Sequence, residues 1–233
     1  KSNGYIVNAV YDNIFFITAP LSAFALGLLI AYSSLPSMKV TIFSHTESPE
    51  TLFLGSFIMA HLFIVFFRSN GNKKIYELYP LRFTVVPLVL FLAMCVSKWV
   101  AVSAAVLATW WDVYHSSLQT FGLGRIYDAR VGNDANVGRR LDYLLNLLIY
   151  AGPILAGSVL MAHTKDFQDY ETVKAMLFAH MGDYIDSKQR YLQFVVMSVG
   201  IPFIAYYLFS YWGYYKQGYK ISPQKVILLA STA

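Results

Sequence analysis

Long apolar runs separated by short polar segments dominate the pattern of this chain. Six runs are interpreted as membrane-spanning helices, which take about 17 to 25 residues each. They cover residues 14–34, 51–67, 83–96, 99–127, 141–163 and 191–212. A seventh begins near Pro223, a residue that is favourable in the first turn of a helix. The pattern therefore predicts an all-α, polytopic membrane helix bundle of six transmembrane helices and the start of a seventh, within a longer chain.

Local signals predict where some of these helices begin and end. Ser48 is a good N-cap, Pro49 suits the first turn, and Glu50 complements the helix dipole. A break around Ser97 and Lys98 separates the third and fourth runs, which predicts a tight hairpin instead of one long helix.

The segment between the fifth and sixth runs is long and amphipathic. In ETVKAMLFAHMGDYI, one helical face would carry Val173, Met176, Leu177 and His180. This pattern predicts a helix that lies on the outer membrane surface.

The composition supports a membrane location for the whole chain. Hydrophobic residues make up 57% and charged residues 13% of the 233 residues, whereas soluble domains carry about 25% charged residues. The single cysteine, Cys95, excludes an intramolecular disulfide and a CxxC metal site. No nucleic-acid-binding signature is present. We therefore expect one transmembrane domain over residues 1–233, surrounded by the lipid bilayer.

Basic residues are concentrated in every second loop. They are Arg68, Lys73, Lys74 and Arg82 after the second run, Arg125, Arg130, Arg139 and Arg140 after the fourth, and Lys216, Lys220 and Lys225 after the sixth. Because basic loops stay on the cytoplasmic side, this alternation predicts a bacterial inner-membrane protein with a cytoplasmic N-terminus.

The fourth run carries a polar stripe. Asp112, His115 and Gln119 have the spacing i, i+3, i+7, so they share one helical face. Ionisable groups inside a span usually face the bundle interior, a partner or a cavity. His61 in the second run and His115 lie about 10 Å and about 15 Å from the basic ends of their helices, at a rise of about 1.5 Å per residue. We therefore expect the two histidines at similar depths.

These residue types are suited to metal binding. Two imidazoles and a carboxylate suit iron, copper or zinc, so His61, Asp112 and His115 are the candidate metal ligands. Gln119 or Tyr114 would orient them by hydrogen bonding. Further ligands could come from Asp142 or Asn146. Two other interpretations stay open: hydrogen-bonded packing between helices, and a proton or substrate path that uses Asp112.

Part of this pattern resembles a known group of proteins. The shared residues are His61 and Arg68, followed by His115, Gln119, Gly122, Arg125 and Tyr127 in a His-x-x-x-Gln-x-x-Gly-x-x-Arg-x-Tyr element. They resemble a group of largely uncharacterised bacterial polytopic membrane proteins. More distantly, the chain is similar to the Brp/Blh carotenoid-cleaving oxygenases. This resemblance implies a non-haem iron oxygenase or other oxidoreductase acting on a lipophilic substrate, with Arg68, Arg125 and Tyr127 near the substrate or the ligands.

Two other functions stay open beside a metalloprotein. The chain could be a non-catalytic subunit of a larger membrane complex, in which the same polar residues bind other membrane subunits. It could also be a proton-coupled transporter that uses Asp112, although no internal repeat is visible.

Overall fold

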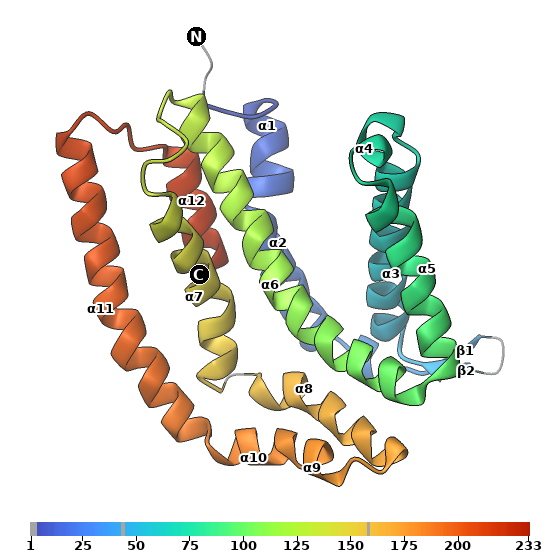
Figure 1. The fold of residues 1–233 in the computed structure, drawn as a ribbon. Helices are drawn as coiled ribbons and strands as arrows, with labels where there is room; N and C mark the ends of the chain where they lie inside the picture. The colour runs from blue at the N-terminus through green and yellow to red at the C-terminus, as the bar shows by residue number, and fades with distance from the viewer. Residues whose placement is uncertain (1–3, 43–44, 158) are drawn as a thin grey trace. The chain divides into compact units, whose positions relative to one another are not determined.

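The computed structural model describes residues 4–42, 45–157 and 159–233, and 81% of the chain is helical, which confirms the all-α class (Figure 1). The first half contains α1 (Ala9–Asp12), the π-helix η1 (Asn13–Ile17), α2 (Ala19–Ala31), the 3-10 helix η2 (Leu35–Ser37), β1 (Val40–Ile42), β2 (His45–Glu47), α3 (Pro49–Asn70), α4 (Lys73–Leu78) and α5 (Pro80–Val96). The second half contains α6 (Lys98–Arg130), α7 (Arg139–Leu155), α8 (Leu160–Thr164), the 3-10 helix η3 (Lys165–Val173), α9 (Met176–Ala179), α10 (Met181–Ser187), α11 (Gln189–Lys216) and α12 (Pro223–Thr232).

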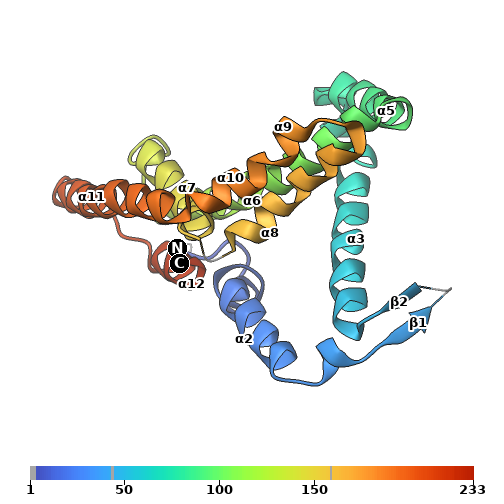
Figure 2. The ribbon, with the colours of Figure 1, turned by 90° about the horizontal axis from the view of Figure 1, so that it is seen from below.

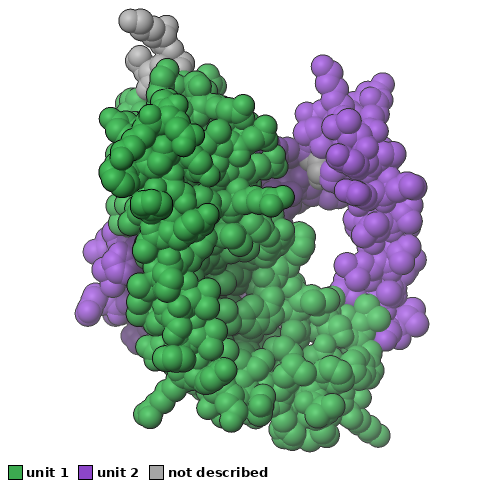
Figure 3. Space-filling view, turned by 60° about the vertical axis from the view of Figure 1, so that its left-hand side comes forward, with its two compact units in different colours: residues 1–21, 98–233 green, residues 22–97 purple. Residues whose placement is uncertain are grey.

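The described residues form two compact units (Figure 3). Unit 1 contains the chain up to Leu21 together with Lys98–Ala233, and unit 2 contains Ser22–Ser97. The expected single domain over residues 1–233 stays a prediction.

Unit 2 consists of apolar helices and one short hairpin. Strands β1 and β2 pair antiparallel, and the Thr41 and Thr46 hydroxyls lie 2.9 Å apart. Helix α3 begins as the sequence predicts, because the Ser48 side chain accepts a hydrogen bond from the Thr51 amide and Pro49 occupies the first turn. Helix α5 ends at Val96, and α6 begins two residues later. The predicted break between the third and fourth runs is therefore confirmed.

Unit 1 is built on the long helix α6. Helices α7 and α12 pack against α6, and α11 packs against α7 (Figure 1). At the C-terminal end of α6, Tyr127 is buried with Ile17 of η1 and Leu228 of α12. This apolar contact joins η1 and α12, which are more than 200 residues apart in the sequence.

A layer of short helices packs on the N-terminal half of α6. Helices α8, η3, α9 and α10 follow one another beside α6 (Figure 2), and η3 contacts it. Tyr170 and Ala179 are buried against Val102 and Val106 of α6.

The single surface helix expected over residues 171–185 is wrong. The segment contains the end of η3, all of α9 and part of α10, because Lys174 adopts a left-handed conformation with φ 58° and ends η3. Within this segment Ala179 is buried, whereas Leu177 is 81% exposed.

The described helices fit a membrane protein. Two of them, α3 over Pro49–Arg68 and α11, are long and apolar enough to span a bilayer. Two further pairs, Ala9–Ile17 with Ala19–Ala31 and Arg139–Leu155 with Leu160–Val173, would each do so only as one bent span. The structure thus gives two to four candidate spans, and the predicted six with a seventh are not confirmed.

The difference has local causes. Helix α5 has 17 residues, which is the lower limit of the length of a span, and the fifth run is divided between α7 and α8. Helix α6 is long enough but carries Asp112, Arg125, Asp128 and Arg130 within its length.

Candidate functional site

The polar stripe predicted on α6 exists and is exposed in unit 1. Asp112, His115 and Gln119 all lie on the exposed surface of α6. The Gln119 side-chain amide nitrogen lies 2.8 Å from His115 Nε2. Tyr114 is partly buried beside the Trp111 ring. The structure therefore brings His115 and Gln119 together as one hydrogen-bonded pair.

The other predicted ligand is in the second unit. His61 lies on the exposed surface of α3, as does Arg68 near the end of that helix. His61 and His115 belong to different units, and their predicted meeting stays a prediction. Within the described ranges, no group of three His, Cys, Asp or Glu side chains is arranged to hold a metal ion.

Three buried charges, Asp128, Asp142 and Lys225, form a compact ion cluster in unit 1 together with the partly buried Arg125. Arg125 Nη1 lies 2.8 Å from Asp128 Oδ2 and 2.6 Å from Asp142 Oδ2. Lys225 Nζ lies 2.8 Å from each of the same two oxygens. The two cations balance the two carboxylates, so the ion cluster has no net charge.

The ion cluster joins α6, α7 and α12, and tyrosines add α11. The hydroxyls of Tyr207 and Tyr211 donate to Asp142 Oδ1 over 2.9 Å and 2.6 Å. Lys225 Nζ in turn donates to the Tyr211 hydroxyl over 2.9 Å. Burial raises the pKa of the neighbouring Tyr219, and the Asp128 carboxylate adds to this effect. These side chains tie together the ends of four helices.

The turn from α6 to α7 positions Asp142. Gly138 precedes α7 with a φ of 69°, in the left-handed region that favours glycine. A side chain there would also collide with the Tyr211 hydroxyl. Asp142 then lies in the first turn of α7, where the helix dipole favours a negative charge.

A second buried polar group fixes the N-terminal segment to α6, and we call it the N-terminal latch (Asp12 and Tyr127). Asp12 accepts hydrogen bonds from the Ile6 and Val7 amides over 2.5 Å and 3.0 Å, and from the Tyr127 hydroxyl over 3.1 Å. Both latch residues have 0% exposure. Arg130 also donates to the Ile6 carbonyl over 3.1 Å. Tyr127, a predicted site residue, therefore has a structural partner.

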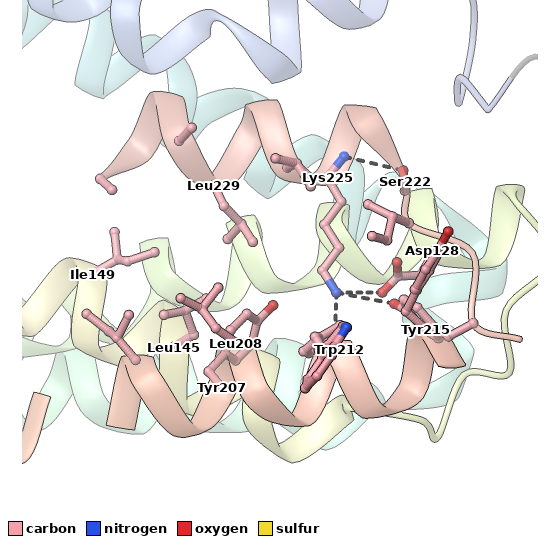
Figure 4. Close-up of a pocket in the computed structure, with 17 residues that line it drawn as sticks. Asp128, Leu145, Ile149, Tyr207, Leu208, Trp212, Tyr215, Ser222, Lys225 and Leu229 are labelled. Carbon is pink, nitrogen blue, oxygen red and sulfur yellow. Dashed lines mark hydrogen bonds and ion pairs between the residues drawn. The ribbon is translucent and has the colours of Figure 1, made fainter. Parts of the chain in front are cut away.

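A pocket of about 540 Å³ lies between α11 and α12, beside the ion cluster (Figure 4). Its lining is almost entirely apolar. The lining residues are Asp128, Leu145, Ile149, Ile204, Tyr207, Leu208, Tyr211, Trp212, Tyr215, Tyr219, Ile221, Ser222, Lys225, Val226, Leu229, Ala230 and Ala233. Figure 4 shows Lys225 and Asp128 together, with Ile149 and Leu145 farther along the pocket. The pocket is therefore an apolar cavity with one polar end.

Sequence reasoning missed most of this arrangement. The sequence predicts Lys225 to be a loop charge that sets topology, but Lys225 is only 5% exposed and pairs with Asp128 and Asp142. Arg125 was a predicted site residue, and its charge is likewise paired inside the ion cluster. The available signal was the position of Asp142 and Lys225 at the starts of two apolar runs.

No protein-family model, curated protein or solved structure matches this chain. The resemblance drawn from its motifs therefore stays a prediction, and the function has to be argued from the geometry.

Proposed function

We propose that this chain is a multi-pass membrane protein that binds a lipophilic small molecule in the pocket between α11 and α12. The observation that carries the proposal is an apolar cavity of about 540 Å³ with a buried, neutral ion cluster at one end. Ligand pockets typically measure about 300–1,000 Å³ and combine apolar walls with a few polar groups. Because α11 is a candidate span, the pocket would be open to molecules dissolved in the bilayer.

The arrangement of loops in unit 1 supports the predicted topology. Asn133, after α6, exchanges two hydrogen bonds of 2.7 Å and 2.9 Å with the backbone of Lys220, after α11. Arg130 reaches the N-terminal segment at Ile6. The N-terminal segment and two predicted cytoplasmic loops thus meet at one end of the unit. We propose that this end faces the cytoplasm of a bacterium.

A photoreactive hydrocarbon tests the pocket. With the protein in phospholipid vesicles, a dodecane that carries a diazirine is expected to label peptides around Leu208 and Leu229 more strongly than lipid-facing peptides. A Leu208→Trp variant fills the pocket and is expected to reduce that labelling about tenfold, equivalent to about 1.4 kcal/mol of binding free energy. Mass spectrometry of the labelled peptides provides the measurement.

The matched control for the pocket is Leu144→Trp. Leu144 is exposed on α7 and does not line the pocket, so this variant should label like the wild type. Equal labelling of pocket and lipid-facing peptides, or no response to Leu208→Trp, would contradict a binding pocket at this place.

A second candidate function is the metalloprotein predicted from the sequence, with His61, Asp112 and His115 as ligands. The contact between Gln119 and His115 favours it, because a partner on one ring nitrogen commonly orients a ligating histidine. The purified full chain is then expected to contain iron, or else copper or zinc, and a His61→Ala/His115→Ala variant should lose it. If metal analysis finds none of the three and the double variant keeps its melting temperature, the metal site is wrong.

A further inference from the structure

We infer that the pocket between α11 and α12 recognises a neutral long-chain alcohol, in preference to an anionic or a cationic amphiphile with the same tail. This inference rests on the proposed binding function and adds to it the chemistry of the head group. It follows from three features of the pocket: the shape of its apolar part, the charge balance of the ion cluster, and one carboxylate oxygen that accepts no well-formed hydrogen bond.

The apolar part of the pocket suits an extended hydrocarbon tail. Lining residues on α12 and at its C-cap extend from Lys225 to Ala233, which spans about 12 Å at a rise of about 1.5 Å per residue. Leu208 and Ile204 of α11 form the opposite wall, so aliphatic side chains surround this length on two sides. A linear chain with its head group toward Lys225 would fill the cavity.

An anionic head group finds no free donor on Lys225. A lysine ammonium has three donors. Lys225 Nζ directs hydrogen bonds of 2.8 Å, 2.8 Å and 2.9 Å to Asp128, Asp142 and Tyr211. A sulfonate or phosphate would also approach the Asp128 carboxylate, so its negative charge would be buried without a counter-ion. Burying an uncompensated charge is costly.

The neutral charge of the ion cluster also disfavours a cationic head group. The two carboxylates of the ion cluster are already neutralised by Arg125 and Lys225. An added ammonium group would lie beside the Lys225 ammonium and bring the buried region to a net positive charge. Its desolvation would therefore not be compensated.

A hydroxyl group can donate the hydrogen bond that the Asp128 carboxylate can still accept. Asp128 lines the pocket and is 1% exposed, and its Oδ1 accepts no well-formed hydrogen bond in the part of the chain that the structure describes, although the Tyr219 hydroxyl lies close to this carboxylate. A buried acceptor without a donor is unfavourable, so a ligand that donates one hydrogen bond is favoured. An alcohol supplies that donor without adding charge.

Four probes with the same diazirine-bearing tail test the inference on the wild-type protein in phosphatidylcholine vesicles. They are dodecanol, its methyl ether, dodecanesulfonate and dodecylamine. Labelling of peptides around Leu208 and Leu229 is divided by labelling around Phe57, which is exposed on the candidate span α3 and does not line the pocket. This ratio corrects for the concentration of each probe in the bilayer. Dodecanol is expected to give a ratio about tenfold above each charged probe. The ether, which lacks the donor, is expected to fall about tenfold below dodecanol, since a hydrogen bond to a charged group is lost.

The outcomes separate the two proposals. If dodecanesulfonate or dodecylamine labels the pocket as strongly as dodecanol, the charge argument is overturned while the pocket still binds lipophilic molecules. If the ether equals the alcohol, the hydroxyl is not the recognised group. If none of the four probes labels the pocket above the Phe57 region, the proposed binding function itself is wrong.

Discussion

Replacing Lys225 with methionine is expected to lower the free energy of unfolding by about 3–5 kcal/mol, because it breaks a buried ion cluster and leaves one partner's charge uncompensated. Asp128 and Asp142 would share a single cation, Arg125, with both carboxylates 1% exposed. Methionine keeps most of the length and apolar volume of lysine, so the loss reports the charge. Chemical or thermal unfolding in detergent, followed by tryptophan fluorescence, gives the measurement.

The matched control is Lys220→Met, five residues earlier. The Lys220 side chain is exposed and its structural contact with Asn133 uses the backbone, so this variant should unfold like the wild type. A Lys225→Met/Asp128→Asn double variant restores the charge balance and should regain part of the lost stability. If the double variant is no more stable than Lys225→Met, charge balance is not what stabilises the ion cluster.

Replacing Asp12 with alanine is expected to detach the N-terminal segment. The Ile6 and Val7 amides and the Tyr127 hydroxyl would lose their acceptor. A buried donor left without a partner costs about 1–3 kcal/mol, so the segment is expected to open to water, and the free energy of unfolding should fall by about 1–3 kcal/mol. In hydrogen exchange, the amides of residues 6 and 7 should exchange much faster, while those in the middle of α7 should be unchanged.

Two further variants serve as comparisons for Asp12→Ala. Tyr127→Phe removes only the hydroxyl and should cost about 1 kcal/mol, the net value of one hydrogen bond. Asp169→Ala replaces an exposed aspartate of η3 and should leave the exchange of residues 6 and 7 unaffected. Unchanged protection of Ile6 and Val7 in Asp12→Ala would contradict the N-terminal latch.

The elements that the sequence predicts well depend on local signals. Ser48 with Pro49 determines where α3 begins, Ser97 separates α5 from α6, and Pro223 begins α12. Each is a property of a few adjacent residues, which propensity and capping rules describe.

The candidate site depends on contacts that local rules do not describe. Lys225 and Asp142 are 83 residues apart in the chain, and the position of Lys225 at the start of an apolar run does not show which carboxylate it pairs with. The same limit applies to Asp12 and Tyr127, which are 115 residues apart. Sequence reasoning placed Arg125 and Tyr127 among the site residues, but without their partners it could not identify the ion cluster or the latch.

The position of α12 in the chain sets an order for biogenesis. The cation that completes the ion cluster, Lys225, leaves the ribosome after Arg125, Asp128 and Asp142 are already in place, and until then the three carry a net negative charge. Ser231 of α12 also donates to the Ile17 carbonyl over 2.5 Å, which spans 214 residues of chain. Because contacts this distant form only after the intervening chain is made, unit 1 is expected to remain open during translation and to close in a late step.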